Sequence, residues 1–178
     1  MTENHHSNDE IKMNGFQYSG LNLIDEVNEL YPELVIDVGC GSNFFKGKIN
    51  NLIGFDKSYH ENLDFHCNIQ NMKVEDNSVD IVLALGSLQY YDRTTAYDDL
   101  STIVRWVKSG GYIVVRVNQL VSESVSAISG MPYRWSKEWI DKISLEFKID
   151  IVKGPVVECN NKLSKRNNIR TVWWWKKQ

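Results

Sequence analysis

The chain has 178 residues, of which 42% are hydrophobic and 24% are charged, as is ordinary for one folded domain with its own core. No apolar run approaches the roughly 18–20 residues of a membrane-spanning helix, so we expect no membrane segment. The polar residues 1–15 lack the apolar stretch of a signal peptide. We expect them to form a flexible arm before a single domain of residues 16–178.

Three cysteines, Cys40, Cys67 and Cys159, bear on the cellular compartment. Their number is odd and none stands in a CxxC pair, which argues against a disulfide framework or a zinc site. We therefore predict a reducing, cytoplasmic setting. His60 and His66 are interpreted as loop and strand residues, so we predict no metal site.

The net charge of −3 is distributed unevenly along the chain. Residues 1–100 carry 6 basic and 17 acidic side chains, whereas residues 101–178 carry 14 and 6. A basic cluster occupies residues 162–177, where an anionic partner such as a nucleic acid could dock. A solvated basic hairpin is the favoured interpretation of this cluster.

Helices and strands alternate in the predicted order of elements. Apolar residues at steps of three or four predict helices, and continuous apolar runs predict buried strands. The predicted helices cover residues 16–30, 92–107 and 136–145. The predicted strands cover residues 34–38, 52–55, 63–67, 79–85, 112–117, 147–157 and 169–175. Pro32 is expected to end the first helix, and Ser109-Gly110-Gly111 to break the chain after the second.

This alternation, with two strands closing the chain, predicts a three-layer α/β/α sandwich. The intervals after the first and second strands are short, so their crossovers must be one-turn helices or loops. The run Trp173–Trp175 is interpreted as core, because alternate side chains of a strand face opposite sides of a sheet. Asp80 is interpreted as a cap at the start of a strand.

The most informative segment is VIDVGCGSN at residues 35–43, followed by LIGFD at residues 52–56. A short apolar run enters a glycine turn, and a second apolar run stops at the carboxylate of Asp56. A strand, a glycine turn and a second strand that ends at an acid are typical of a nucleoside-binding α/β site. Glycines let the backbone approach a ligand because they have no Cβ, and the acid can accept two hydrogen bonds from a ribose diol. The segment therefore predicts an adenosine-containing cofactor.

Four segments in this order resemble the class I S-adenosylmethionine-dependent methyltransferases. Residues 35–43 resemble the glycine-rich first motif, and GFDKS at residues 54–58 resembles the acidic second motif. Residues 67–90 are similar to the adenine-contacting segment and fourth strand, and residues 103–117 to the helix, glycine turn and fifth strand. The resemblance implies a Rossmann-like, mostly parallel seven-stranded sheet with an antiparallel last strand. It also implies methyl transfer (EC class 2.1.1) from S-adenosyl-L-methionine, with S-adenosyl-L-homocysteine as product.

Ten residues are assigned to the cofactor by this resemblance: Asp37, Gly39, Cys40, Gly41, Asp56, Lys57, Asn68, Ile69, Leu85 and Gly86. Gly39 and Gly41 would let the turn pass beside the methionine part, with the small Cys40 between them. Asp37 would engage the cofactor's amino group, directly or through water. Asp56 would bind the ribose hydroxyls.

The remaining five cofactor residues would surround the two ends of the ligand. Lys57 would lie beside the adenine, Asn68 would accept a hydrogen bond from its amino group, and Ile69 would contact the ring. Leu85 and Gly86 would line the methionine end near the reactive methyl. One departure is Asn43, which stands where the family often has a third glycine; Asn tolerates unusual backbone angles better than most residues.

The acceptor side is less defined, and no general base is assigned. The candidates for substrate contact are Gln89, Tyr90, Tyr91, Asn118 and Arg134. The segment LALGSLQYY lacks the Asn/Asp-Pro-Pro-Tyr/Phe motif of enzymes that methylate exocyclic amines of DNA bases. The acceptor stays open between a small molecule, a sugar or lipid intermediate and a nucleic acid.

Two further alternatives stay open at this point. The chain could be a non-catalytic module or regulatory subunit that binds S-adenosylmethionine or S-adenosylhomocysteine, because it is short and has no obvious base. A homodimer is also left open, since the trimmed crossovers leave no room for a large lid and a second subunit could complete the acceptor site.

Overall fold

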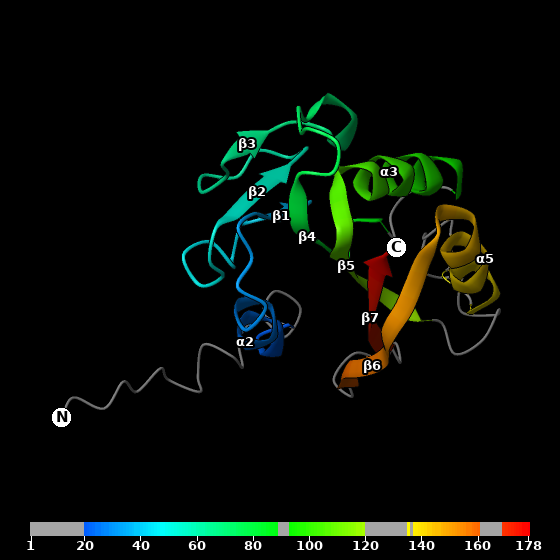
Figure 1. The fold of residues 1–178 in the computed structure, drawn as a ribbon. Coiled ribbons are helices and arrows are strands. Elements are labelled where there is room, and N and C mark those ends of the chain that lie inside the picture. The colour runs from blue at the N-terminus through cyan, green and yellow to red at the C-terminus, as the bar shows by residue number, and fades with distance from the viewer. Residues whose placement is uncertain (1–19, 89–92, 120–134, 136, 161–168) are drawn as a thin grey trace.

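The computed structural model describes residues 20–88, 93–119, 135, 137–160 and 169–178 (Figure 1). The helices are α2 (Asn22–Asn28), the short 3-10 helix η1 (Ile69–Asn71), α3 (Arg93–Trp106) and α5 (Lys137–Phe147). The strands are β1 (Val35–Val38), β2 (Leu52–Asp56), β3 (Phe65–His66), β4 (Val79–Leu85), β5 (Val107–Gln119), β6 (Ile149–Asn160) and β7 (Ile169–Lys177). The expected arm of residues 1–15 lies outside the described residues.

The seven strands form one sheet in the order β3-β2-β1-β4-β5-β7-β6. Neighbours from β3 to β5 pair in parallel, and β7 runs antiparallel between β5 and β6. This confirms the predicted mixed sheet with an antiparallel last strand. Because the parallel strands share a direction, the carboxyl ends of β1, β2 and β4 meet at one edge, where ligands bind in folds of this kind.

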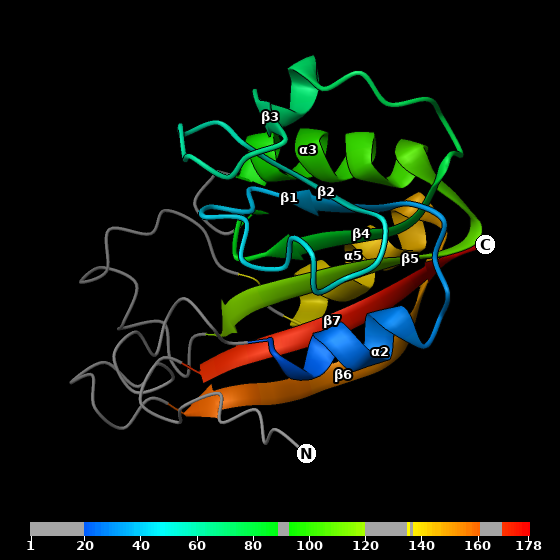
Figure 2. The same cartoon turned by 90° about the vertical axis from the view of Figure 1, so that its left-hand side faces the viewer.

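Helices cover both faces of the sheet, which confirms the three-layer prediction (Figures 1 and 2). On one face, α3 and α5 bury Leu100, Ile103 and Ile140 in the larger apolar cluster. On the other face, α2 buries Leu23 and Val27 in a smaller cluster. Among the described helices, the second face is therefore covered by the shortest of the three α-helices, α2.

The tryptophan run of β7 is divided between these two clusters. Trp173 and Trp175 belong to the cluster under α3 and α5, and Trp174 belongs to the cluster under α2. All three are at most 5% exposed. The core interpretation is confirmed, since a strand alternates its side chains between the two faces.

A turn, not a helix, replaces the crossover between β1 and β2. The N–H of Lys46 donates to the Asn43 carbonyl at 3.1 Å, and that of Ile49 donates to the Phe45 carbonyl at 3.0 Å. Phe45 and Ile49 bury their side chains in the α2-side cluster. The short crossover predicted from the sequence is confirmed, and Phe45 serves as core.

The observed boundaries of α2, β5 and β3 differ from the sequence prediction in ways that bear on the fold. Helix α2 ends at Asn28, before Leu30, because Tyr31 turns the chain with a positive φ of 49°. Strand β5 begins directly after α3 and includes Ser109-Gly110-Gly111, whose extra residues are accommodated as an irregularity opposite Asp80. The third strand is only two residues long.

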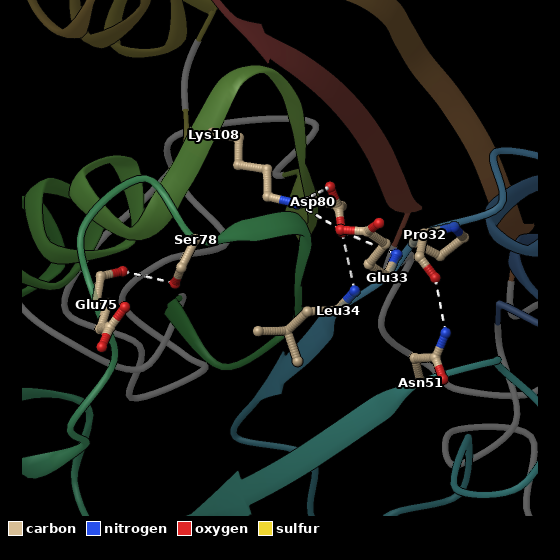
Figure 3. Close-up of polar contacts among 8 residues, drawn as sticks. All are labelled: Pro32, Glu33, Leu34, Asn51, Glu75, Ser78, Asp80 and Lys108. Atoms are coloured by element: carbon tan, nitrogen blue, oxygen red, sulfur yellow. Dashed lines mark hydrogen bonds and ion pairs between the residues drawn. The ribbon is translucent and has the colours of Figure 1, made fainter.

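Asp80 caps the start of its neighbouring strand, as predicted (Figure 3). Its Oδ2 accepts the backbone N–H groups of Glu33 and Leu34, both at 2.9 Å, and its Oδ1 accepts Lys108 Nζ at 2.8 Å. Asp80 thus ties the amino ends of β1, β4 and β5 together, at the edge opposite the site described below.

No helix in the described ranges is both long and apolar enough to cross a membrane.

Candidate cofactor site

Three neighbouring strands place the predicted cofactor residues at one edge of the sheet. Asp37 on β1 lies opposite Gly54 of β2 on one side and opposite Leu83 of β4 on the other. Asp56 is the last residue of β2 and Leu85 the last residue of β4. The structure therefore brings these separate motifs together, as the sequence predicts.

Gly39 is required where the first turn passes β4. Its φ is +65°, and an added Cβ would lie 2.5 Å from the Cβ of Ser87. Gly41, with φ +56°, faces open space, because no atom would lie within 4 Å of its Cβ. The first glycine thus permits close packing against the turn after β4, while the second leaves the ligand side of the turn free of a side chain.

Asp56 connects the turn to the end of β2. Its Oδ2 accepts the N–H of Gly41 at 2.9 Å, and its Oδ1 accepts the N–H of Ser58 at 2.8 Å. A carboxylate has about four lone-pair positions, so each oxygen retains capacity for a hydroxyl donor. The half-buried carboxylate is therefore fixed in direction and can still bind a ribose diol.

Asp37 is a buried acid, 3% exposed, in the internal strand β1. Burial raises the pKa of Asp37 to about 7; the Arg116 guanidinium opposes that rise and the Asp56 carboxylate adds to it. Cys40 lies beside the same acids, and burial together with the charges of Asp37 and Asp56 raises the pKa of its thiol. Cys40 therefore stays a protonated thiol at neutral pH, which argues against a nucleophilic role.

Asn43 occupies the left-handed backbone region, with φ 55°, as its place in the glycine pattern suggests. Its Nδ2 donates to the Asn62 carbonyl at 2.9 Å and to Asp64 Oδ2 at 3.1 Å. Asp64 also accepts the Gly54 N–H at 2.8 Å and pairs with Lys46. We call Asn43, Lys46, Gly54 and Asp64 the turn latch, because it holds the short crossover against β2.

The predicted adenine segment lies beyond β3. Ile69 is buried, and Asn68 is exposed with an extended backbone at the start of η1. The next residue, Gln70, donates its Nε2 to Asp99 Oδ1 of α3 at 2.9 Å. This contact, which sequence reasoning missed, joins η1 to α3 and fixes the direction of the segment.

Arg116 is a second residue that sequence reasoning missed. It is half-buried in β5, and its Nη2 donates to the Leu85 carbonyl at 2.7 Å. That carbonyl precedes Gly86, whose φ of 98° turns the chain away from β4. The sequence feature that could have indicated Arg116 is a basic residue inside the apolar run YIVVRV.

Most acceptor-side candidates fall outside the described residues, namely Gln89, Tyr90, Tyr91 and Arg134. The backbone of Asn118 lies in β5, opposite Arg170 of β7. Lys57 is exposed beside Asp56. The described structure therefore defines the cofactor side of the site.

Comparison with known proteins finds a family model that matches the part of the chain that contains the site. Residues 36–115, which span β1 to β5, match the model of the family described as "Methyltransferase domain". This part of the chain matches a methyltransferase domain, and the sheet has the strand order of the class I S-adenosylmethionine-dependent methyltransferase fold. The match covers the glycine turn, Asp56 and the end of β4 together, and ends one residue before Arg116.

A curated relative and two solved structures are similar to this methyltransferase domain. Phosphoethanolamine N-methyltransferase 1 of Triticum aestivum is 26% identical over 174 residues, covering 80% of this chain. The chain spans about a third (35%) of that relative's length.

Among solved structures, the 1,6-didemethyltoxoflavin-N1-methyltransferase of Burkholderia thailandensis, with bound S-adenosylhomocysteine, has a TM-score of 0.73 at 11% identity. The match covers 96% of this chain and 83% of that one. The magnesium protoporphyrin IX methyltransferase of Synechocystis, with bound S-adenosylmethionine, has a TM-score of 0.65 at 13% identity. This second match covers 92% of this chain and 80% of the Synechocystis chain. At these identities the likeness shows a shared fold.

The residues present fit the family's cofactor, S-adenosylmethionine. Gly41 leaves open space beside the turn, where a Cβ would otherwise project. The acids Asp37 and Asp56 suit an ammonium group and a ribose diol, and the backbone bonds that Asp56 accepts fix its direction. The donor set therefore agrees with the family on the described side of the site.

Proposed function

We propose that this chain catalyses the transfer of a methyl group from S-adenosylmethionine to a small-molecule acceptor. The observation that carries the proposal is the assembly of buried Asp37, close-packed Gly39 and Asp56 at the carboxyl ends of neighbouring strands. The names of the similar proteins, which refer to phosphoethanolamine, 1,6-didemethyltoxoflavin and magnesium protoporphyrin IX, support a small acceptor. Because the fold also hosts other functions, the proposal rests on the residues of the site.

The chain's own residues contribute binding and orientation. When bound, S-adenosylmethionine supplies an electrophilic methyl group on a positively charged sulfur. Asp37 provides a negative charge at the amino-acid end, and Asp56 fixes the sugar. Holding the donor in one orientation next to the acceptor lowers the entropic part of the barrier. The Leu85 carbonyl, held by Arg116, borders the methionine end.

Replacing Asp56 by Asn tests the cofactor assignment. The variant keeps an oxygen for backbone N–H donors but loses the charge and one acceptor, so S-adenosylhomocysteine should bind about 10- to 100-fold more weakly, measured by isothermal titration calorimetry. Asp76→Asn is the matched control, because Asp76 pairs with Arg105 on the surface, away from the strand ends. Equal affinity of D56N and wild type would remove Asp56 from the site.

Catalysis is tested separately from binding. Purified protein is incubated with methyl-labelled S-adenosylmethionine and a broad pool of small amines, alcohols and carboxylic acids, and labelled products are counted. Transfer to any member supports the enzyme. Tight binding with no transfer to any member supports the non-catalytic cofactor-binding module instead.

The proposal includes a cytoplasmic location and an acceptor that is not a nucleic acid. The odd number of cysteines fits a reducing compartment. Of the basic C-terminal residues, Lys177 donates to the Val104 and Val107 carbonyls at 2.9 and 2.8 Å. This internal use of Lys177 favours the packing role of the last strand over a nucleic-acid dock.

A further inference from the structure

A cation and a buried acid share one face of the sheet at the cofactor site. Val35 and Val114 both belong to the apolar cluster under α2. Side chains of a strand alternate between faces, so Asp37 and Arg116, each two residues further along, face the same side. Strand β4 lies between them, with Leu83 opposite Asp37 and Leu85 opposite Arg116.

Arg116 is held in this place by the backbone of β4. Its Nη2 donates to the Leu85 carbonyl at 2.7 Å, which holds the guanidinium at the end of β4, the strand between β5 and β1. The side chain is half-buried, so its charge is only partly screened by solvent. Its charge acts on Asp37 more strongly than does that of Asp56.

The charged groups around Asp37 oppose one another. Burial favours the neutral acid, and so does the carboxylate of Asp56 on β2. Within the described ranges, the Arg116 guanidinium favours the carboxylate form of Asp37, while the thiol of Cys40 stays neutral. Arg116 thus opposes the effects of burial and of the second acid, although burial has the larger effect on the pKa of Asp37.

The ionisation of Asp37 matters because its expected ligand is an ammonium group. A carboxylate attracts an ammonium, whereas a protonated acid loses the charge that makes such a hydrogen bond strong. Since the pKa of Asp37 is about 7, adding or removing a nearby charge alters the ionised fraction of Asp37 near neutral pH.

We propose that Arg116 is a positioning residue that keeps Asp37 in its carboxylate form and thereby sets the lower pH limit of cofactor binding. The inference rests on the proposed cofactor-binding function. The hydrogen bond to Leu85 orients Arg116, and Arg116 in turn acts on the ligand through Asp37. The ligand class is an adenosyl amino acid with a free ammonium group.

Two substitutions separate the charge of Arg116 from its hydrogen bond. Arg116→Gln keeps an N–H donor for the Leu85 carbonyl and removes the charge. Arg116→Lys keeps the charge and a donor. Circular dichroism and thermal melting of both variants establish that the sheet is intact before binding is measured.

The first readout is the affinity for S-adenosylhomocysteine by calorimetry from pH 5.5 to 9. Wild-type affinity should rise with pH through about 7, as Asp37 loses its proton. In R116Q the midpoint should move up by about one pH unit or more, because an opposite charge nearby shifts a carboxyl pKa by roughly 1–3 units. In R116K the midpoint should stay near the wild-type value.

The second readout needs no cofactor. Carboxyl ¹³C resonances of the free protein, labelled at aspartate and assigned with Asp37→Asn, report the titration of Asp37 directly. R116Q should move this titration to higher pH. An unchanged Asp37 titration in R116Q, or an affinity lowered equally at every pH, would overturn the role of Arg116.

Failure of the cofactor assignment gives a different result. If the wild-type protein binds S-adenosylhomocysteine at no pH while R116Q still shifts the Asp37 resonance, the electrostatic coupling stands and the proposed cofactor function is wrong. If the wild type binds but R116Q leaves both readouts unchanged, the cofactor function stands and the coupling is wrong.

Discussion

At the scale of single residues, the site places ionisable groups where they cost stability. Asp37 is buried in β1, and burial raises its pKa from the ordinary value of 3.8 to about 7. The folded protein therefore binds a proton on Asp37 more tightly than the unfolded chain does. The stability linked to this proton is fully present below about pH 3.8 and is lost as pH rises through about 7.

Replacing Asp37 by Asn should therefore stabilise the free protein above neutral pH. The uncharged amide avoids burying an ionised acid, so we expect a melting temperature at pH 8 that is higher by about 3 °C or more, since roughly 1 kcal/mol corresponds to 2–4 °C at this size. Near pH 5 the gain should disappear, because wild-type Asp37 is then protonated. Calorimetric melting of both proteins at the two pH values measures this; an equal or lower melting temperature for D37N at pH 8 would contradict the burial argument.

At the scale of elements, the turn latch takes the place of a crossover helix. The Asp64 carboxylate accepts hydrogen bonds from the Gly54 N–H and Asn43 Nδ2 and pairs with the Lys46 ammonium. Burial opposes its charge, but the hydrogen bonds from Gly54, Lys46 and Asn43 outweigh burial and hold the pKa of Asp64 below its usual value. The latch fixes the glycine turn, and thereby Gly41, relative to β2.

Substituting Asn for Asp64 should loosen this turn. The amide cannot satisfy all three donors, so we expect a loss of about 1–3 kcal/mol in the free energy of unfolding at pH 7, measured by urea titration. Because the pKa of Asp64 is lowered in the folded state, the wild-type advantage should shrink as pH falls toward and below 3.8. Asp141→Asn removes an exposed pair with Lys137 and serves as control. A D64N effect no larger than that of the control would mean that the latch adds no stability.

At the scale of the whole molecule, local patterns predict the sheet well. The apolar run of β4 was predicted with its observed bounds, because a strand buried on both faces needs no partner to be recognised. The end of α2 was misplaced because Leu30 fits the helical spacing, yet it lies past the end of the helix, directly before the turn at Tyr31, and is 43% exposed. The start of β5 was missed because Ser109-Gly110-Gly111 resembles a break and is accommodated within a strand.

The same contrast applies to the site. Asp37, Gly39 and Asp56 could be predicted because each belongs to a short motif whose spacing is fixed by the local chain. Arg116 could not, because its role depends on the register between β4 and β5. Asp64 could not, because its partners lie 10, 18 and 21 residues away in the chain. Residues whose role depends on contacts made by the folded chain are therefore recognised only once the structure is known.

The most direct test of the central claim is a crystal structure of the chain soaked with S-adenosylhomocysteine. We expect density at the carboxyl ends of β1, β2 and β4, with the ribose hydroxyls on Asp56, the amino group near Asp37, and the ligand passing beside Gly41. Density elsewhere, or none in this place at saturating ligand, would contradict the assignment of this edge of the sheet to the methyl donor.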